Sequence, residues 1–163
     1  MLMVCGEALL DVFQGDETRT GMLLDANVGG SPFNLAVGLA RLGQPAALFT
    51  AISTGFAGER LMRTLRDEGV NTESIARSAA ATTLSLIGLD AQGVPSYAFY
   101  GEGCADRLVG LDDLARVPAE LALLNLGSFA TVVEPVASTQ RALVERERAR
   151  GAARALIAYD PNI

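Results

Sequence analysis

The feature of this sequence that most restricts its fold is the alternation of short apolar runs with segments of helical periodicity. The runs at 46–52, 122–126 and 156–159 each have the length of a buried strand. Helical patterns at 57–68 and 135–150 separate them, each followed by a glycine. Because strands that alternate with helices pair in parallel, we expect an α/β fold with a doubly wound, mostly parallel sheet.

The N-terminal part continues the same alternation. The apolar run at 3–10 predicts one buried strand that ends at Asp11. A helix is expected over 33–42, with Gly43 as its stop. The apolar residues at helical spacing in that helix are Leu35, Leu39 and Leu42.

Two segments break the alternation. Residues 12–28 carry turn signals and a short apolar run, and 82–100 has the pattern of a hairpin around a turn at 90–93. Neither segment contains a helix that could connect parallel strands. We therefore expect them to form a small β layer beside the main sheet.

Composition excludes several classes of function. The net charge is −6 and the chain has no histidine, which argues against nucleic-acid or anionic-lipid partners and against histidine-based triads or metal sites. Cys5 and Cys104 are interpreted as buried thiols rather than a disulfide framework. With no basic leader and no apolar stretch of about 18 residues, we expect a cytoplasmic protein without a membrane span.

The segment Gly-Gly-Ser-Pro-Phe-Asn at 29–34 is the most informative for function. Without Cβ atoms, Gly29 and Gly30 let the backbone approach a ligand closely, and a helix N-terminus offers free N–H groups. Asn34 adds a donor and an acceptor in the first turn. The alternative is an ordinary glycine-rich turn with Ser31 as the N-cap.

Asp11 is the second candidate. A carboxylate is costly to bury unless it is paired or bound to a ligand. It can accept hydrogen bonds from two neighbouring sugar hydroxyls. The alternative is a solvated aspartate at the end of a strand.

Taken in order, five segments resemble the ribokinase-like (PfkB) carbohydrate kinase family, of the bacterial fructokinase type. The resemblance covers the whole chain and is much more specific than any one segment. The matching segments are Gly-Glu-Ala-Leu-Leu-Asp at 6–11, Gly-Gly-Ser-Pro-Phe-Asn-Leu-Ala at 29–36, Ile-Ser-Thr at 52–54, Tyr-Ala-Phe-Tyr at 97–100 and Asp-Pro-Asn at 160–162.

The resemblance implies a ribokinase-like sheet with helices on both faces and a β lid over the sugar. The lid would come from segments 12–28 and 82–100. Phe99 would pack against the sugar, although it could equally be a packing residue of the lid hairpin. The residues that would hold the sugar hydroxyls are Asp11, Gly29, Gly30 and Asn34.

By the same resemblance, the activity is ATP-dependent phosphorylation of a sugar, with Mg2+ and ATP as cofactors. Fructose is favoured, because Gly101 stands where related ketodeoxygluconate kinases tend to carry an arginine. Another sugar, such as 2-keto-3-deoxygluconate or ribose, is the alternative. A homodimer through the lid is expected from the family alone.

The family's Asn-x-x-Glu and Gly-Ala-Gly-Asp motifs are absent from the sequence. We therefore expect residues 1–163 to be the N-terminal part of the kinase domain, incomplete at the C-terminus. The expected chain supplies the sugar-binding half and lacks the ATP and catalytic half, with no catalytic residue and no metal ligand. A further alternative is a truncated, non-catalytic sugar-binding fragment.

Overall fold

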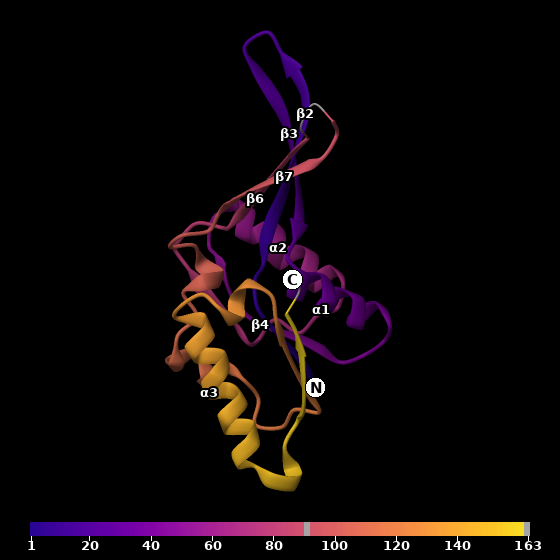
Figure 1. Cartoon of the computed structure of the whole chain (residues 1–163). Helices are drawn as coiled ribbons and strands as arrows, with labels where there is room; N and C mark the ends of the chain where they lie inside the picture. The colour runs from indigo at the N-terminus through magenta and orange to yellow at the C-terminus, as the bar shows by residue number, and fades with distance from the viewer. Residues whose placement is uncertain (90–91, 162–163) are drawn as a thin grey trace.

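A computed structural model describes residues 1–89 and 92–161, which form a main sheet and a small sheet (Figure 1). The main sheet has five strands in the order β5-β4-β1-β8-β9, and every pair is parallel. Its strands are β1 (Leu2–Cys5), β4 (Ala46–Ser53), β5 (Ile75–Ser78), β8 (Leu123–Gly127) and β9 (Leu156–Asp160). The predicted parallel α/β architecture is confirmed.

Helices cover both faces of the main sheet. They are α1 (Ser31–Arg41), α2 (Phe56–Asp67) and α3 (Val136–Ala149), with short 3-10 helices η1 (Ala105–Arg107), η2 (Leu111–Arg116), η3 (Phe129–Thr131) and η4 (Gly151–Ala153). Successive residues of β4 point to opposite faces. Leu48 packs in the core with Phe33 of α1 and Leu61 of α2, whereas Phe49 packs in a second core with Leu143 of α3. The sheet is therefore doubly wound.

The small sheet projects from the body as a long arm (Figure 1). Its four strands have the order β3-β2-β6-β7, and they are β2 (Leu9–Thr18), β3 (Gly21–Gly29), β6 (Leu84–Leu89) and β7 (Pro95–Tyr100). Two antiparallel hairpins, β2–β3 and β6–β7, are joined by parallel pairing of β2 with β6. The segments that broke the alternation thus pair with one another, while the turn residues Asp90 and Ala91 lie outside the described residues.

The prediction of one strand over 3–10 is wrong. The chain leaves the main sheet after Cys5, turns at Gly6 with φ 147°, and enters the small sheet at Leu9. Asp11 is therefore the third residue of β2 and does not end a strand. Gly6 and Glu7 interrupt the apolar run at this turn, but both are buried together with the strand ends on either side, so the pattern of buried residues continues across it.

The helix expected over 33–42 is α1, but Leu35 and Leu42 do not lie on its buried face. Leu42 is 77% exposed and Leu35 is exposed as well, while Phe33 and Ala36 are buried. The helix begins at Ser31 with Gly30 as its N-cap, so Ser31 does not cap it. Its buried face is set by contact with β1 and β4, which the leucine spacing does not report.

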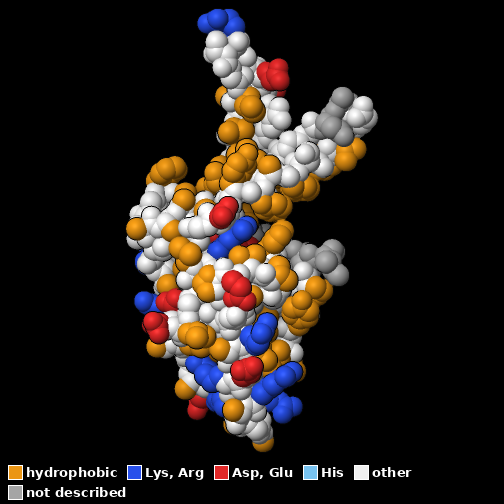
Figure 2. All heavy atoms as spheres, turned by 60° about the vertical axis from the view of Figure 1, so that its left-hand side comes forward, with side chains coloured by type: hydrophobic (Ala, Val, Ile, Leu, Met, Phe, Trp, Pro, Cys, Tyr) orange, Lys and Arg blue, Asp and Glu red, His pale blue; other side chains and the backbone are white. Residues whose placement is uncertain are grey.

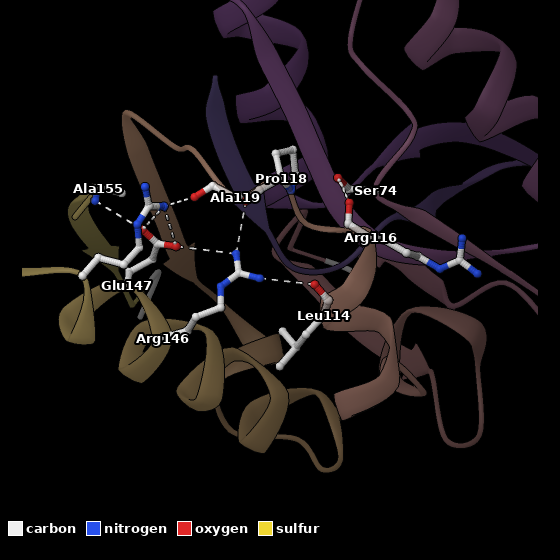
Figure 3. Close-up of polar contacts among 9 residues, drawn as sticks. Ser74, Leu114, Arg116, Pro118, Ala119, Arg146, Glu147 and Ala155 are labelled. Carbon is white, nitrogen blue, oxygen red and sulfur yellow. Dashed lines mark hydrogen bonds and ion pairs between the residues drawn. The ribbon is translucent and has the colours of Figure 1, made fainter. Parts of the chain in front are cut away.

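A buried charge cluster fixes α3 to the body (Figure 3). The Glu147 carboxylate is fully buried and forms ion pairs with Arg146 at 3.5 Å and Arg150 at 3.3 Å. It also accepts a hydrogen bond from the Ala155 amide at 3.3 Å, and both arginines donate to backbone carbonyls within 114–119. Because both arginines are already paired with Glu147 and with backbone carbonyls, we interpret the cluster as structural rather than as a ligand site.

Candidate functional site

Four register partners place a row of side chains across the small sheet. Asp11 pairs with Asn27 of β3 on one side and with Ser85 of β6 on the other, and Ser85 pairs with Phe99 of β7. Directly paired residues project from the same face of a sheet. We call Asn27, Asp11, Ser85 and Phe99 the cross-strand row. It sets amide, carboxylate and aromatic groups on one face of the sheet, with the buried Ser85 hydroxyl between Asp11 and Phe99.

Asp11 lies directly against Gly29. A Cβ on Gly29 would be 2.0 Å from Asp11 Oδ2 and 2.8 Å from its carboxyl carbon. The carboxylate therefore covers the backbone just before α1. The sequence placed both residues among the candidates, and the structure brings them into contact.

Partial burial governs the charge of Asp11. Burial raises the pKa of this carboxyl above its usual 3.8, and donation from the Ser85 hydroxyl opposes that rise. Asp11 is half-buried. Asp11 is thus partly desolvated. The alternative interpretation required a freely solvated aspartate and does not describe it.

Gly30 and Asn34 open helix α1. Gly30 has φ 105°, and a Cβ there would lie 2.8 Å from the Glu7 carbonyl oxygen. The backbone N–H of Asn34 donates a hydrogen bond to the Gly30 carbonyl at 2.9 Å, and the residue is exposed in the first turn. Both residues therefore follow the point where Asp11 meets Gly29, at one junction between the small sheet and the main sheet.

Phe99 connects the small sheet to the body. Its ring centroid lies 5.1 Å from that of Phe129, with the rings tilted by 54°. Phe99 nevertheless remains 45% exposed. It therefore packs against the body and still presents apolar surface, and both of its predicted roles are compatible with this position.

A pocket lies between the small sheet and the body, beside the cross-strand row. The small sheet contributes Leu9 and Phe99, and Thr83 precedes β6. The body contributes Phe129 and several apolar side chains. The charged residues of its lining are Glu7, Asp106 and Arg107.

Two carboxyl groups in this pocket are almost completely buried. Asp106 is 4% exposed and accepts a hydrogen bond of 2.5 Å from Thr83 Oγ1, while Glu7 is 6% exposed. Burial raises the pKa of both groups above their usual values. Within the described chain, Glu7 Oε2 has no hydrogen-bond partner. The pocket therefore holds acceptor capacity that a ligand hydroxyl could satisfy.

Sequence reasoning missed several of these residues. Asn27 and Ser85 enter the row through strand register, which only pairing between distant segments fixes. One signal was available for Asn27, because it stands two residues before Gly29 and alternate strand residues share a face. Asp106 follows the Tyr-Ala-Phe-Tyr segment and belongs to the same family resemblance, but nothing in the sequence indicated that it would be buried.

Across residues 1–89 and 92–161, no three His, Cys, Asp or Glu side chains cluster in a way that could hold a metal ion. Asn162, part of the last segment of the family resemblance, lies outside the described residues. No helix in the described structure is both long and apolar enough to span a membrane.

The model of the pfkB family carbohydrate kinases matches residues 1–161. The chain belongs to this family. Over all 163 residues it is 36% identical to a fructokinase of Rhizobium leguminosarum bv. trifolii, of which it covers 48%. It is 32% identical over 137 residues to fructokinase-1 of Zea mays, covering 83% of this chain and 42% of the maize protein.

Solved structures agree with this family assignment. The crystal structure of a fructokinase from Xylella fastidiosa superposes with a TM-score of 0.88 at 26% identity, covering 99% of this chain and 50% of that one. The predicted ribokinase-like fold is thereby confirmed. The chain spans about half the length of the relatives it matches.

Proposed function

We propose that this chain provides the sugar-binding part of a cytoplasmic, ATP-dependent fructokinase. The observation that carries the proposal is the cross-strand row beside the Asp11–Gly29 contact. A sugar needs several donors and acceptors on one face and an apolar surface for its C–H groups. The row supplies both, at the opening of helix α1.

In the proposed complex, the Asp11 carboxylate accepts hydrogen bonds from two sugar hydroxyls. The position of Asp11 against Gly29 and beside its register partner Ser85 holds the carboxylate in place before the sugar arrives, which lowers the entropic cost of binding. Gly29 and Gly30 allow the sugar to approach the backbone, and Asn34 reaches it from α1. Phe99 covers the sugar from the small sheet.

These residues bind and orient the sugar, and none of them is proposed as a catalyst. Phosphoryl transfer depends on positioning and on stabilising charge. When bound, ATP with Mg2+ would supply the phosphoryl group and neutralise its charge. The Gly-Ala-Gly-Asp motif of the family is absent from this sequence, so we propose that this chain alone holds sugar without phosphorylating it.

Fructose is the proposed substrate because the relatives with the highest identity reported above are named fructokinases. 2-Keto-3-deoxygluconate and ribose are the competing sugars. Binding of sugar without any catalysis is the second candidate function, favoured by the absence of Gly-Ala-Gly-Asp from the sequence.

We also propose that two copies associate through the small sheet. Large apolar side chains gather along it (Figure 2). Exposed apolar surface of this kind marks interaction sites in soluble proteins. The exposed residues are Met22, Leu23, Leu24, Leu89, Val94, Tyr97 and Tyr100.

Calorimetric titration with fructose, ribose and 2-keto-3-deoxygluconate tests the proposal. We expect fructose to bind and Asp11→Ala to weaken binding by about 1.5–3 kcal/mol, or about 10- to 150-fold, as for a hydrogen bond to a charged group. Asp16→Ala is the matched control, because Asp16 lies exposed on the same strand. Equal fructose affinity in the wild type and Asp11→Ala would contradict the assigned role.

A further inference from the structure

The guanidinium of Arg107 lies against the backbone of Gly101. A Cβ on Gly101 would be 2.3 Å from Arg107 Nη2, 2.4 Å from Cζ and 2.5 Å from Nε. Gly101 directly follows β7 and is buried. Only glycine leaves the space that this guanidinium occupies.

The position of Arg107 alters the interpretation of Gly101. The sequence analysis interpreted Gly101 as a site without the arginine of acid-sugar kinases. In the structure, a guanidinium occupies that place but comes from η1, six residues along the chain. The site beside Phe99 therefore does carry a positive charge.

Arg107 has unused hydrogen-bonding capacity toward the pocket. It lines the pocket together with Phe99, and its side chain is half-buried. Its guanidinium donates no hydrogen bond to any residue in the described part of the chain, although it carries five N–H donors. A ligand with acceptor oxygens would satisfy these donors.

The surrounding charges select the kind of ligand. The Arg107 charge lowers the pKa of the adjacent Asp106 carboxyl, against the larger effect of burial, and Glu7 lines the same pocket. Two buried carboxyl groups already share this pocket with one guanidinium. A ligand carboxylate would have to compete with them for it, whereas a hydroxyl or carbonyl oxygen needs only the free N–H donors of Arg107.

We propose that Arg107 is a further substrate-contacting residue, which donates hydrogen bonds to a hydroxyl or carbonyl oxygen of a neutral sugar, and that position 101 is glycine to admit its guanidinium. The proposal rests on the proposed sugar-binding function and names the side chain that restricts the substrate to uncharged sugars. It adds a contact outside the cross-strand row.

Titration of the whole chain with fructose and with 2-keto-3-deoxygluconate tests this. We expect Arg107→Ala to weaken fructose binding about tenfold or more and Arg107→Lys to weaken it less, because lysine keeps the charge but not the planar set of donors. Gly101→Ala should weaken fructose binding as Arg107→Ala does, because the alanine Cβ displaces the guanidinium. This variant keeps the arginine charge in the protein and so tests the position of the guanidinium alone. Gly110→Ala is the control, since a Cβ there meets no atom within 4 Å.

The possible results separate the two proposals. If the wild type binds fructose and Asp11→Ala does not, but Arg107→Ala and Arg107→Lys both bind as the wild type does, the Arg107 proposal is wrong and the proposed function stands. Tighter binding of the acid sugar that depends on Arg107 would overturn the neutral-sugar assignment. A wild type that is folded by circular dichroism and binds no sugar would overturn both proposals.

Discussion

The carboxylate of Asp11 occupies the space that a side chain at Gly29 would need, because a Cβ there would lie 2.0 Å from Asp11 Oδ2. The two residues stand on paired strands, and Leu9 is the register partner of Gly29. The glycine therefore determines where the acid lies. This contact links the small sheet to the start of helix α1 and defines the proposed sugar site.

Gly29→Ala is expected to displace the Asp11 carboxylate. Fructose affinity should fall about as far as in Asp11→Ala, and the unfolding free energy should fall by about 1–3 kcal/mol, the usual cost of overpacking. Calorimetry and urea denaturation measure the two effects. Gly38→Ala in α1 is the control, because its Cβ meets nothing within 4 Å and alanine favours a helix. Unchanged affinity in Gly29→Ala would show that the contact does not position the acid.

Asp106 should make stability depend on pH. Burial raises its pKa above 3.8, so the folded state holds this proton more strongly than the unfolded state does. Its stabilising contribution is complete below the unfolded pKa and is lost as pH rises through the raised pKa. Asp106→Asn, which keeps an acceptor for Thr83, should remove this loss and be at least as stable near neutral pH.

Urea denaturation across the acidic range measures the difference between wild type and Asp106→Asn. The exposed Asp112→Asn serves as the matched control. Parallel pH profiles for the wild type and Asp106→Asn would contradict a raised pKa at Asp106.

The 163-residue chain should show no sugar-dependent ATP turnover. Its sequence contains neither Asn-x-x-Glu nor Gly-Ala-Gly-Asp, and its described residues hold no metal cluster. A coupled assay for ADP with fructose present or absent measures turnover, and Asp11→Ala controls for contaminating kinases. Turnover well above background that Asp11→Ala abolishes would refute the proposal that this chain only binds sugar.

The exposed apolar side chains of β9 should promote self-association. Among the described residues β9 is the last strand of the main sheet, and Leu156 and Tyr159 are 68% and 62% exposed. An unpaired apolar edge is a template for pairing between chains. Sedimentation should show concentration-dependent association that Tyr159→Lys reduces.

A second variant distinguishes association at this edge from association through the small sheet. Leu24→Lys changes the small sheet and leaves β9 intact. If Leu24→Lys alone reduces association, the contact is the proposed dimer through the small sheet. A sharp unfolding transition of a monomeric wild type would contradict both forms of association.

Much of the architecture was predictable because it depends on local pattern. Apolar runs and helical spacing located the strands and helices of the main sheet, and Leu61 and Leu65 of α2 are buried on one face as the spacing predicts. In α1 the spacing of the leucines does not identify the buried face, because Phe33 and Ala36 are buried instead. Spacing identifies a helix, but neighbouring elements decide which face is covered.

The sequence by itself determined the alternation of strands and helices, the glycine pair and the residue types of the proposed sugar site. Only the tertiary structure decided that the chain changes sheets at Gly6, that Asn27 and Ser85 flank Asp11, and that Arg107 lies on Gly101. The reason is that strand register and contacts across distant segments depend on how whole elements pack. No periodicity within one segment records that packing.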